Sequence, residues 1–499
     1  MNIGNALMVM LLVSAGALGA EPLRLHPENP RYFLFRGQPT VLIGSSEHYG
    51  SVMNLDFNYV RYLDAIKAAG LNATRIFTGQ YRERPGKFGP GIDFEIVQNT
   101  LAPLADRFIC PWPRTNQPGA ADGGNKFDLS KWNEAYFKRL KDVVEQASRR
   151  GIVVEVSLFC PYYVPHVGDH FWEISPWNAR NNINGIGNLP GADALTLQDP
   201  RLLAVQDAMV RKIVNELRDF DNVYYEICNE PWSPRVPRDW EAHIAATIAE
   251  AESSFAARHL IAQEFGFDMV GTKIRKVQKV ENPVPQASVF PSHAGPEAVR
   301  LSYGVGKPLG VNETGGKTAD APYRLQAWGT LLAGGALFIG LDYSFTVGHE
   351  DGSFALPAGQ PGGGSPALRR QFSILRTFME NLDFLRMAPA PSVIKEGLPT
   401  DSSAYVLADA GKSYAIYVGH GRVVKEKDGW SRTEVDATHR QLSLTLDLPA
   451  GSYLATWVNT KTGGIDKKEQ FTCRGGAQVL QSPKYSEDIA LRISRASGS

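Results

Sequence analysis

Short apolar runs alternate with amphipathic segments along most of the chain. The runs at 152–159 (IVVEVSLF) and 223–228 (VYYEIC) are rich in β-branched and aromatic residues, a pattern typical of strands buried on both faces. Between them, residues 200–220 carry Leu202, Met209 and Leu217 at helical spacing. Because parallel strands need long crossover connections and helices supply them, the alternation predicts an α/β fold with a parallel sheet.

Eight such strand and helix units follow one another between residues 40 and 387. The strands are expected to end near residues 48, 78, 159, 228, 264, 292, 312 and 344, and the stretch 269–280 is ambiguous. Eight parallel strands can close on themselves without an open edge. Residues 21–387 are therefore predicted to form a (β/α)₈ TIM barrel.

The pattern changes after Met387. Residues 388–403 contain Pro and Ser and are predicted to be a linker, and residues 404–499 hold alternating runs separated by Gly- and Pro-containing turns. Alternation of this kind indicates antiparallel strands. The C-terminal part is therefore predicted to be a small β-sandwich domain.

Residues 1–20 are predicted to be a cleaved signal peptide. Residues 6–20 (ALMVMLLVSAGALGA) are apolar but too short to span a bilayer, and small residues precede Glu21. The segment begins without Lys or Arg, which departs from the usual signal, so an N-terminal anchor or core segment is the alternative. We expect a secreted or periplasmic protein with no membrane span.

Composition and charge narrow the class of partner. Lys and Arg together number 52, as do Asp and Glu, so no basic surplus indicates nucleic acid, and a neutral partner such as a carbohydrate fits better. The sequence does not determine an oligomeric state. The four cysteines lack a CxxC motif, and Cys110 and Cys160, each followed by a proline, are candidates to pair.

Two glutamates stand out because each ends a predicted strand. The run at 223–228 stops at Asn229, Glu230 and Pro231, and proline cannot continue a central strand, so Glu230 is expected at the C-terminal rim where TIM barrels build active sites. Glu313 ends a second strand 83 residues later, about three βα units on, and Gly315-Gly316 follow it. Two carboxylates at one rim can reach the separation of about 5 to 5.5 Å used in glycoside hydrolysis, and a pair of rim ion-pair partners is the alternative.

Five motifs carry a resemblance to a known family: FDLSKW (127–132), YYEICNEP (224–231), KPLGVNE (307–313), QAWGTLLAGGA (326–336) and GSYLATWVNTKTGG (451–464). With these the chain resembles the clan A glycoside hydrolases, close to family 5 (the cellulases) and to apiosidase-like barrels with a C-terminal β-sandwich. The resemblance implies that Glu230 is the acid/base and Glu313 the nucleophile. It also implies that Asn229 contacts the sugar 2-hydroxyl and that Arg75 keeps Glu313 ionised.

The expected function is that of a secreted retaining β-glycoside hydrolase, which cleaves O-glycosidic bonds of a polysaccharide or oligosaccharide by double displacement. This mechanism needs no cofactor. It needs Glu230 protonated, which partial burial and the charge on Glu313 are expected to achieve. The alternative is a non-catalytic carbohydrate-binding or adhesion protein on a glycosidase scaffold, which a carboxylate gap well above about 6 Å and no arginine near Glu313 would favour.

Around strand six the chain departs from the family 5 pattern, where a His and a Tyr lie two residues apart. Here His293 is followed by Ala294-Gly295, so Tyr343 is expected to replace the missing tyrosine.

Further substrate-binding candidates lie in the predicted rim loops. Aromatic rings there could stack on sugar C–H faces, although small loop cores are an equal alternative for each of Trp112, Trp172, Trp177, Trp232, Tyr162 and Tyr163. Glu47 and His48 end the first strand and are expected to bond substrate hydroxyls. His166, Asp169 and His170 have a metal-like spacing but lie in a loop, so no metal is expected.

Overall fold

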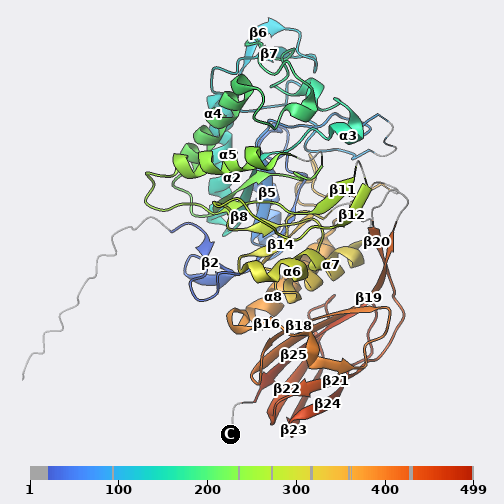
Figure 1. The fold of residues 1–499 in the computed structure, drawn as a ribbon. Coiled ribbons are helices and arrows are strands. Elements are labelled where there is room, and N and C mark those ends of the chain that lie inside the picture. Colours follow the sequence, from blue (N-terminus) through green and yellow to red (C-terminus); the bar gives the residue numbers. More distant parts are fainter. Residues whose placement is uncertain are drawn as a thin grey trace, which may run out of the picture.

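The computed structural model describes residues 21–90, 92, 95–233, 236–270, 273–314, 319–357, 360, 362–425 and 431–496. The expected signal peptide and the pair Gly315-Gly316 lie outside these residues. The described chain forms a barrel of parallel strands followed by an antiparallel C-terminal domain (Figure 1). This confirms the predicted fold class.

The barrel consists of eight parallel strands. They are β4 (Leu42–Ser46), β5 (Ala73–Phe77), β8 (Val153–Phe159), β9 (Val223–Cys228), β10 (Ile261–Ala262), β13 (Phe290–Pro291), β14 (Leu309–Val311) and β15 (Leu337–Leu341). β15 pairs with β4, and a parallel bridge from Ala262 to Val289 joins the two ends of the sheet. The carboxyl ends of all eight strands therefore meet at one rim.

Helices cover the outside of the barrel. They are α1 (Tyr59–Ala68), α2 (Glu134–Arg149), α4 (Pro200–Leu217), α5 (Arg238–Ala251), α6 (Pro296–Ser302), α7 (Asp320–Leu332) and α8 (Pro366–Glu380). Helix α4 illustrates why such a segment is helical and packs on the barrel. Asp199 accepts hydrogen bonds from the first-turn amides and Pro200 starts the helix. Leu202, Met209 and Leu217 are buried against the strands.

One crossover differs from the expected eight strand and helix units. The ambiguous stretch after β10 forms an antiparallel hairpin, β11 (Phe267–Val270) and β12 (Lys273–Val277), in the place of a helix. Lys273, Arg275 and Lys276 leave this stretch without an apolar face at helical spacing, so a helix there would have nothing to bury.

Smaller elements complete the barrel domain. At the floor, β1 (Arg24–Leu25), β2 (Phe33–Phe35) and β3 (Gln38–Thr40) form a sheet, in which Arg36-Gly37 is the turn between β2 and β3. The rim loops carry β6 (Arg114–Pro118), β7 (Asn125–Phe127) and α3 (Val164–Val167). Single 3₁₀ turns lie at Trp172–Ile174, Gly191–Asp193, Tyr303–Val305, Phe384–Arg386 and Pro391–Val393.

The C-terminal domain packs two antiparallel sheets face to face, as predicted. The larger contains β16 (Ala388–Pro389), β18 (Ser402–Asp409), β19 (Ser413–Lys425), β20 (Ser431–Val435), β22 (Gly451–Val458), β23 (Ile465–Cys473) and β25 (Asp488–Arg495). The smaller contains β17 (Ile394–Glu396), β21 (Ser443–Leu448) and β24 (Gly476–Gln481). The segment expected to be a linker thus contributes β16 and β17 to the sandwich.

The sandwich rests on helix α7 of the barrel (Figure 1). The buried rings of Trp328 and Tyr417 stack at 5.4 Å, and buried Arg324 forms ion pairs with Asp488 at 2.9 Å and with Glu487 at 2.6 Å. The interface therefore buries apolar and charged side chains of both domains.

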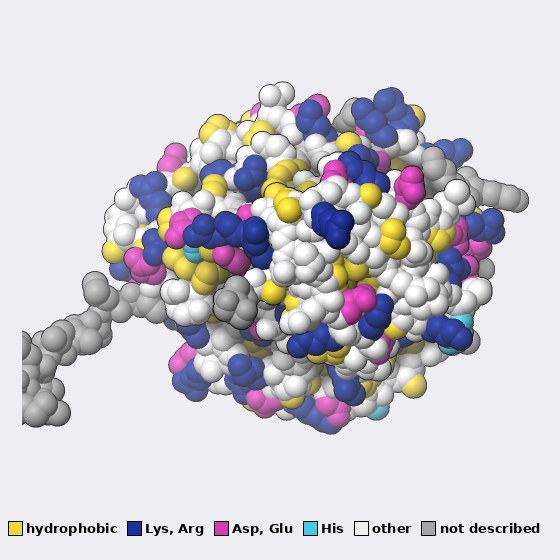
Figure 2. Space-filling model, turned by 90° about the horizontal axis from the view of Figure 1, so that it is seen from below, with side chains coloured by type: hydrophobic (Ala, Val, Ile, Leu, Met, Phe, Trp, Pro, Cys, Tyr) yellow, Lys and Arg dark blue, Asp and Glu magenta, His cyan; other side chains and the backbone are white. Residues whose placement is uncertain are grey.

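The molecular surface agrees with the balanced charge of the sequence. On the face shown in Figure 2, Lys and Arg side chains lie among Asp and Glu side chains, and neither sign forms a continuous patch. No helix among the described residues is long and apolar enough to cross a membrane.

Candidate active site

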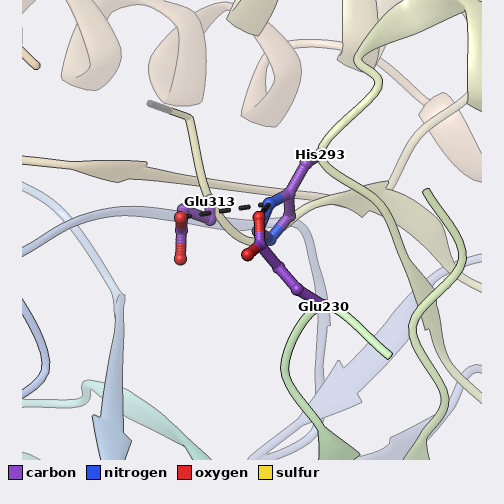
Figure 3. Close-up of side chains that lie close together, drawn as sticks. All are labelled: Glu230, His293 and Glu313. Atoms are coloured by element: carbon purple, nitrogen blue, oxygen red, sulfur yellow. Dashed lines mark hydrogen bonds and ion pairs between the residues drawn. The ribbon is translucent and has the colours of Figure 1, made fainter. Parts of the chain in front are cut away.

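The two glutamates predicted from the strand ends come together at the rim. Glu230 follows β9 and Glu313 follows β14, and one carboxylate oxygen of each lies within 4.8 Å of the other and of a ring nitrogen of His293. Figure 3 shows the three side chains pointing toward one another. A single sugar ring can contact both carboxylates at this separation.

Arg75 anchors this group from inside the barrel. Its fully buried guanidinium lies 3.1 Å from Glu313 and donates a hydrogen bond of 2.9 Å to Asn229 Oδ1. The amide of Asn229 donates in turn to the Tyr163 hydroxyl at 2.8 Å. Arg75 therefore contacts the expected nucleophile directly, and Asn229 is joined to it through Arg75.

Two further carboxylates lie beneath Arg75 and were not foreseen. Glu155 is 3.2 Å from the guanidinium, Glu226 contacts it more closely, and Asn312 donates to both at 2.7 and 2.6 Å. Burial and the charge of Glu226 raise the pKa of Glu155 to about 8. The signal for both was present in the sequence, because each is a lone acid inside an apolar strand.

His293 links the catalytic candidates. Its Nδ1 lies 3.0 Å from Glu230 Oε1 and 3.9 Å from Glu313, and its Nε2 lies 2.6 Å from Glu264 Oε1. Burial alone would lower the pKa of His293, but the charges of Glu264 and Glu313 and its hydrogen bond with Glu230 raise it well above the usual range. The ring is therefore an imidazolium at neutral pH.

The protonation expected for Glu230 is wrong for this state. Burial would raise the pKa of Glu230, but the hydrogen bond and charge of His293, together with Tyr163 and Arg75, outweigh it and lower the pKa. The prediction considered only burial and the charge on Glu313, because sequence does not tell how close a histidine ring lies. The proton nearest to Glu230 thus resides on His293.

Two candidates at the first strand have different surroundings from those expected. The fully buried carboxylate of Glu47 accepts hydrogen bonds from the amides of Ser51 and Gly50, at 2.8 and 3.0 Å, so it braces the rim loop rather than facing a substrate. His48 donates from Nδ1 to Asn99 Oδ1 at 2.8 Å and packs edge-on against Tyr343 with ring centroids 5.1 Å apart.

Most of the aromatic candidates form a loop core, which was the stated alternative. Trp172 and Trp177 are 2% and 0% exposed, Trp177 packs against Trp112, and the Trp172 indole donates to the Leu189 carbonyl at 3.0 Å. These rings offer no free face to a sugar. Trp232 differs, because it is half-buried and lies edge-on to His293 with ring centroids 5.2 Å apart.

A cavity of about 530 Å³ opens beside Trp232. The loop after β9 and the β11–β12 hairpin form its walls, with Phe265, Phe267 and Met269 on the apolar side and Glu264 at the edge nearest to Glu230.

Metal binding is possible in principle at one place. Among the described residues, one group of His, Cys, Asp or Glu side chains lies at metal-ligand spacing, and it consists of Glu230, His293 and Glu313. His166, Asp169 and His170 do not form such a group. The raised pKa of His293 means that a proton competes with any metal ion for that ring.

The cysteines take no part. All four are buried and free, so Cys110 and Cys160 do not pair; their thiols donate instead to the carbonyls of Trp112 and Pro161.

Comparison with known proteins bears on the fold. A family model described as "Domain of unknown function (DUF6298)" matches residues 99–234. A solved structure of a putative glycoside hydrolase from Bacteroides vulgatus ATCC 8482 superposes with a TM-score of 0.61 at 14% identity, over 97% of this chain and 84% of that one. A family 5 glycoside hydrolase from the same organism superposes with a TM-score of 0.57 at 14% identity, over 95% and 93%. The chain has the fold of glycoside hydrolase family 5.

A third structure, titled "Glycoside hydrolase", has a TM-score of 0.57 at 14% identity and covers 96% of this chain and 98% of its own. The agreement thus extends over the barrel and the sandwich together. A search of curated protein sequences finds no match.

Within this family 5 fold, two tyrosines lie near Glu313. Burial and then the charge of Glu313 raise the pKa of both Tyr343 and Tyr49 well above the usual range. Tyr49 also stacks under the Arg75 guanidinium, 4.9 Å from the ring centroid. Tyr343 was predicted; Tyr49 was not, although it directly follows Glu47 and His48 at the end of the first strand.

Proposed function

We propose that the protein is a retaining β-glycoside hydrolase acting on a neutral polysaccharide or oligosaccharide. The observation that carries the proposal is the approach of one oxygen of Glu230 to one of Glu313 within 4.8 Å, with Arg75 on Glu313 and His293 on Glu230. Retaining enzymes place their carboxyl groups about 5 to 5.5 Å apart, whereas inverting enzymes need about 6.5 to 9.5 Å to admit a water molecule. The gap therefore favours double displacement.

In the first step Glu313 attacks the anomeric carbon and the bond to the leaving oxygen breaks. Arg75 forms an ion pair with the attacking carboxylate at 3.1 Å. Glu230 gives a proton to the leaving oxygen, and this proton reaches Glu230 Oε1 from His293 Nδ1 over the 3.0 Å contact. His293 is then neutral, and Glu313 is esterified to the sugar.

In the second step Glu230 acts as a base. It removes a proton from water, the water oxygen attacks the anomeric carbon, and the ester bond to Glu313 breaks, which frees the sugar with its original configuration. The proton returns through Glu230 to His293. Asn229, held by Arg75 at 2.9 Å, is placed to bond the sugar 2-hydroxyl.

The alternative of a non-catalytic carbohydrate-binding protein loses support. Both conditions that would favour it, a wide carboxylate gap and no arginine at Glu313, are contrary to the geometry.

The test is a screen of nitrophenyl β-glycosides and plant polysaccharides with the wild type, Glu313→Gln and Glu230→Gln. We expect both variants to lose about 10³-fold or more in kcat/KM, and proton NMR of the first-formed product to show the β-anomer. Glu252→Gln is the matched control, because Glu252 is a buried glutamate paired with a histidine away from the rim. Unchanged activity in Glu313→Gln, or an α-anomer as first product, would reject the proposal.

We further propose that residues 1–20 are removed on export, which would leave the barrel and the C-terminal sandwich. The apolar composition of residues 6–20 supports the export of the chain. N-terminal sequencing of the protein recovered outside the cytoplasm tests it, and retention of residue 1 would contradict it.

A further inference from the structure

Glu264 ends the fifth predicted strand, but neither the sequence analysis nor the family resemblance gives it a role. It lies two residues after β10, its side chain is fully buried, and its two oxygens have different partners. Oε2 accepts a hydrogen bond of 2.7 Å from the backbone N–H of Glu230, and Oε1 lies 2.6 Å from His293 Nε2. One carboxylate thus contacts both the main chain of the expected acid/base and the ring that touches its side chain.

The contact with the Glu230 backbone has a conformational reason. Glu230 has a φ of 41°, in the left-handed region that residues with a Cβ rarely adopt because it strains the backbone. A hydrogen bond to a charged acceptor is about twice as strong as a neutral one and can hold the amide in this orientation. The left-handed turn directs the Glu230 carboxylate toward His293 and Glu313.

We propose that Glu264 is a positioning residue of the active site: its two oxygens hold the strained backbone of Glu230 and the Nε2 side of His293, and so direct the Nδ1 proton of His293 toward Glu230. The proposal rests on the proposed function, since it concerns the proton that Glu230 must deliver to the leaving group.

Charged groups from four strands determine whether the proton between His293 and Glu230 resides on the histidine ring. Glu230 after β9, Glu264 after β10 and Glu313 after β14 face the imidazole directly, while Arg75 on β5 faces it from behind Glu313. Burial raises the pKa of Glu264 to about 7, although His293 opposes the rise. Removing the charge of Glu264 takes away the partner that holds the proton at Nε2.

Glu264→Gln keeps the shape and removes the charge. Its amide oxygen can still accept from the Glu230 N–H, but its NH₂ group then faces Nε2, which must give up its proton to accept the hydrogen bond. We expect His293 to become a neutral ring that titrates at a lower pH than in the wild type. Glu252→Gln is the matched control, because its partner His259 lies at 2.6 Å in an equally buried pair before β10, at the opposite end of the strand.

The first readout needs no substrate. Nitrogen-15 NMR of labelled histidines, with His293→Asn to assign the signal, should find both His293 ring nitrogens protonated at pH 7 in the wild type and in Glu252→Gln. In Glu264→Gln the His293 ring should lose its proton at a pH at least about one unit lower than in the wild type. A wild-type His293 with an unprotonated Nε2 at pH 7, or an unchanged titration in Glu264→Gln, would overturn the proposal whether or not the variant is active.

The second readout uses the hydrolase assay with whichever nitrophenyl β-glycoside the wild type cleaves. We expect Glu264→Gln to lose about 10- to 100-fold in kcat/KM and the high-pH limb of its profile to move down by about one unit. Lost activity with an unmoved limb would mean a merely structural role and would also overturn the proposal. Altered NMR titration without any wild-type activity would instead refute the proposed function and leave the placement of His293 by Glu264 intact.

Discussion

Replacing Arg75 by Met removes the one cation that faces the buried carboxylates inside the barrel among the described residues. The guanidinium lies 3.2 Å from Glu155 and 3.1 Å from Glu313 and also contacts Glu226, and the side chains of Arg75, Glu155 and Glu226 are all 0% exposed. Methionine fills a similar space without charge. The variant therefore leaves the two acids of the barrel interior facing each other at a site buried from solvent.

The magnitude follows from this burial. Removing one partner of a buried ion pair costs about 3–5 kcal/mol, because the other partner keeps its desolvation penalty. The folded variant can reduce this cost by taking up a proton, as burial and the charge of Glu226 already raise the pKa of Glu155 to about 8. A folded state that binds more protons than the unfolded state loses stability as pH rises, by about 1.4 kcal/mol per pH unit for each extra proton. Arg75→Met should thus be least destabilised near pH 5 and most near pH 8.

Urea unfolding followed by tryptophan fluorescence between pH 5 and pH 8 measures this effect. Arg139→Met is the matched control, since half-buried Arg139 donates to the backbone carbonyls of Ser51, Val52, Asn54 and Phe57 and, within the described part of the chain, to no carboxylate. We expect the control to lose stability by an amount that does not depend on pH. The electrostatic reasoning would be refuted if Arg75→Met followed the same pH course as Arg139→Met, or if it were as stable as the wild type at pH 8.

Three further outcomes are expected. Glu230→Ala should lose much less activity on dinitrophenyl than on alkyl glycosides, and azide should restore its turnover with a β-glycosyl azide as product; no rescue would contradict the acid/base role. Arg324→Met should lower the free energy of unfolding by about 3–5 kcal/mol and separate two calorimetric transitions, because Asp488 stays buried without its partner at 2.9 Å; a single unshifted transition would contradict a shared interface. Dialysis against EDTA should leave hydrolysis unchanged, while added Zn²⁺ should inhibit less at low pH, where protonation of His293 competes with the ion.

The barrel and the sandwich could be predicted from sequence because periodicity is a local property. Buried strands of a parallel sheet read as short apolar runs, and the face of α4 was apparent from its spacing. The hairpin β11–β12 was ambiguous for the same reason, since a short charged stretch has no strong period. Where the sequence pattern is weak, tertiary pairing determines the local structure. Here β10 pairs with β9 and bridges to the residue before β13, which fixes both ends of the segment that contains the hairpin.

Within the site, sequence predicted the residues whose function depends on where strands end. Glu230, Glu313 and Arg75 follow from strand boundaries and the family resemblance. It placed Glu264 at the end of a strand but gave it no role, and it left the burial of Trp172 and Trp177 open, because contacts with side chains from other strands and loops decide both.

The sequence by itself therefore determined the architecture, the placement of two glutamates at one rim and the balanced charge. Only the tertiary structure decided the protonation of Glu230, because the pKa of a buried group depends on charges within a few ångströms that come from distant strands. Glu230, His293 and Glu264 lie on three different strands, and their mutual distances of 3.0 and 2.6 Å place the proton on the histidine.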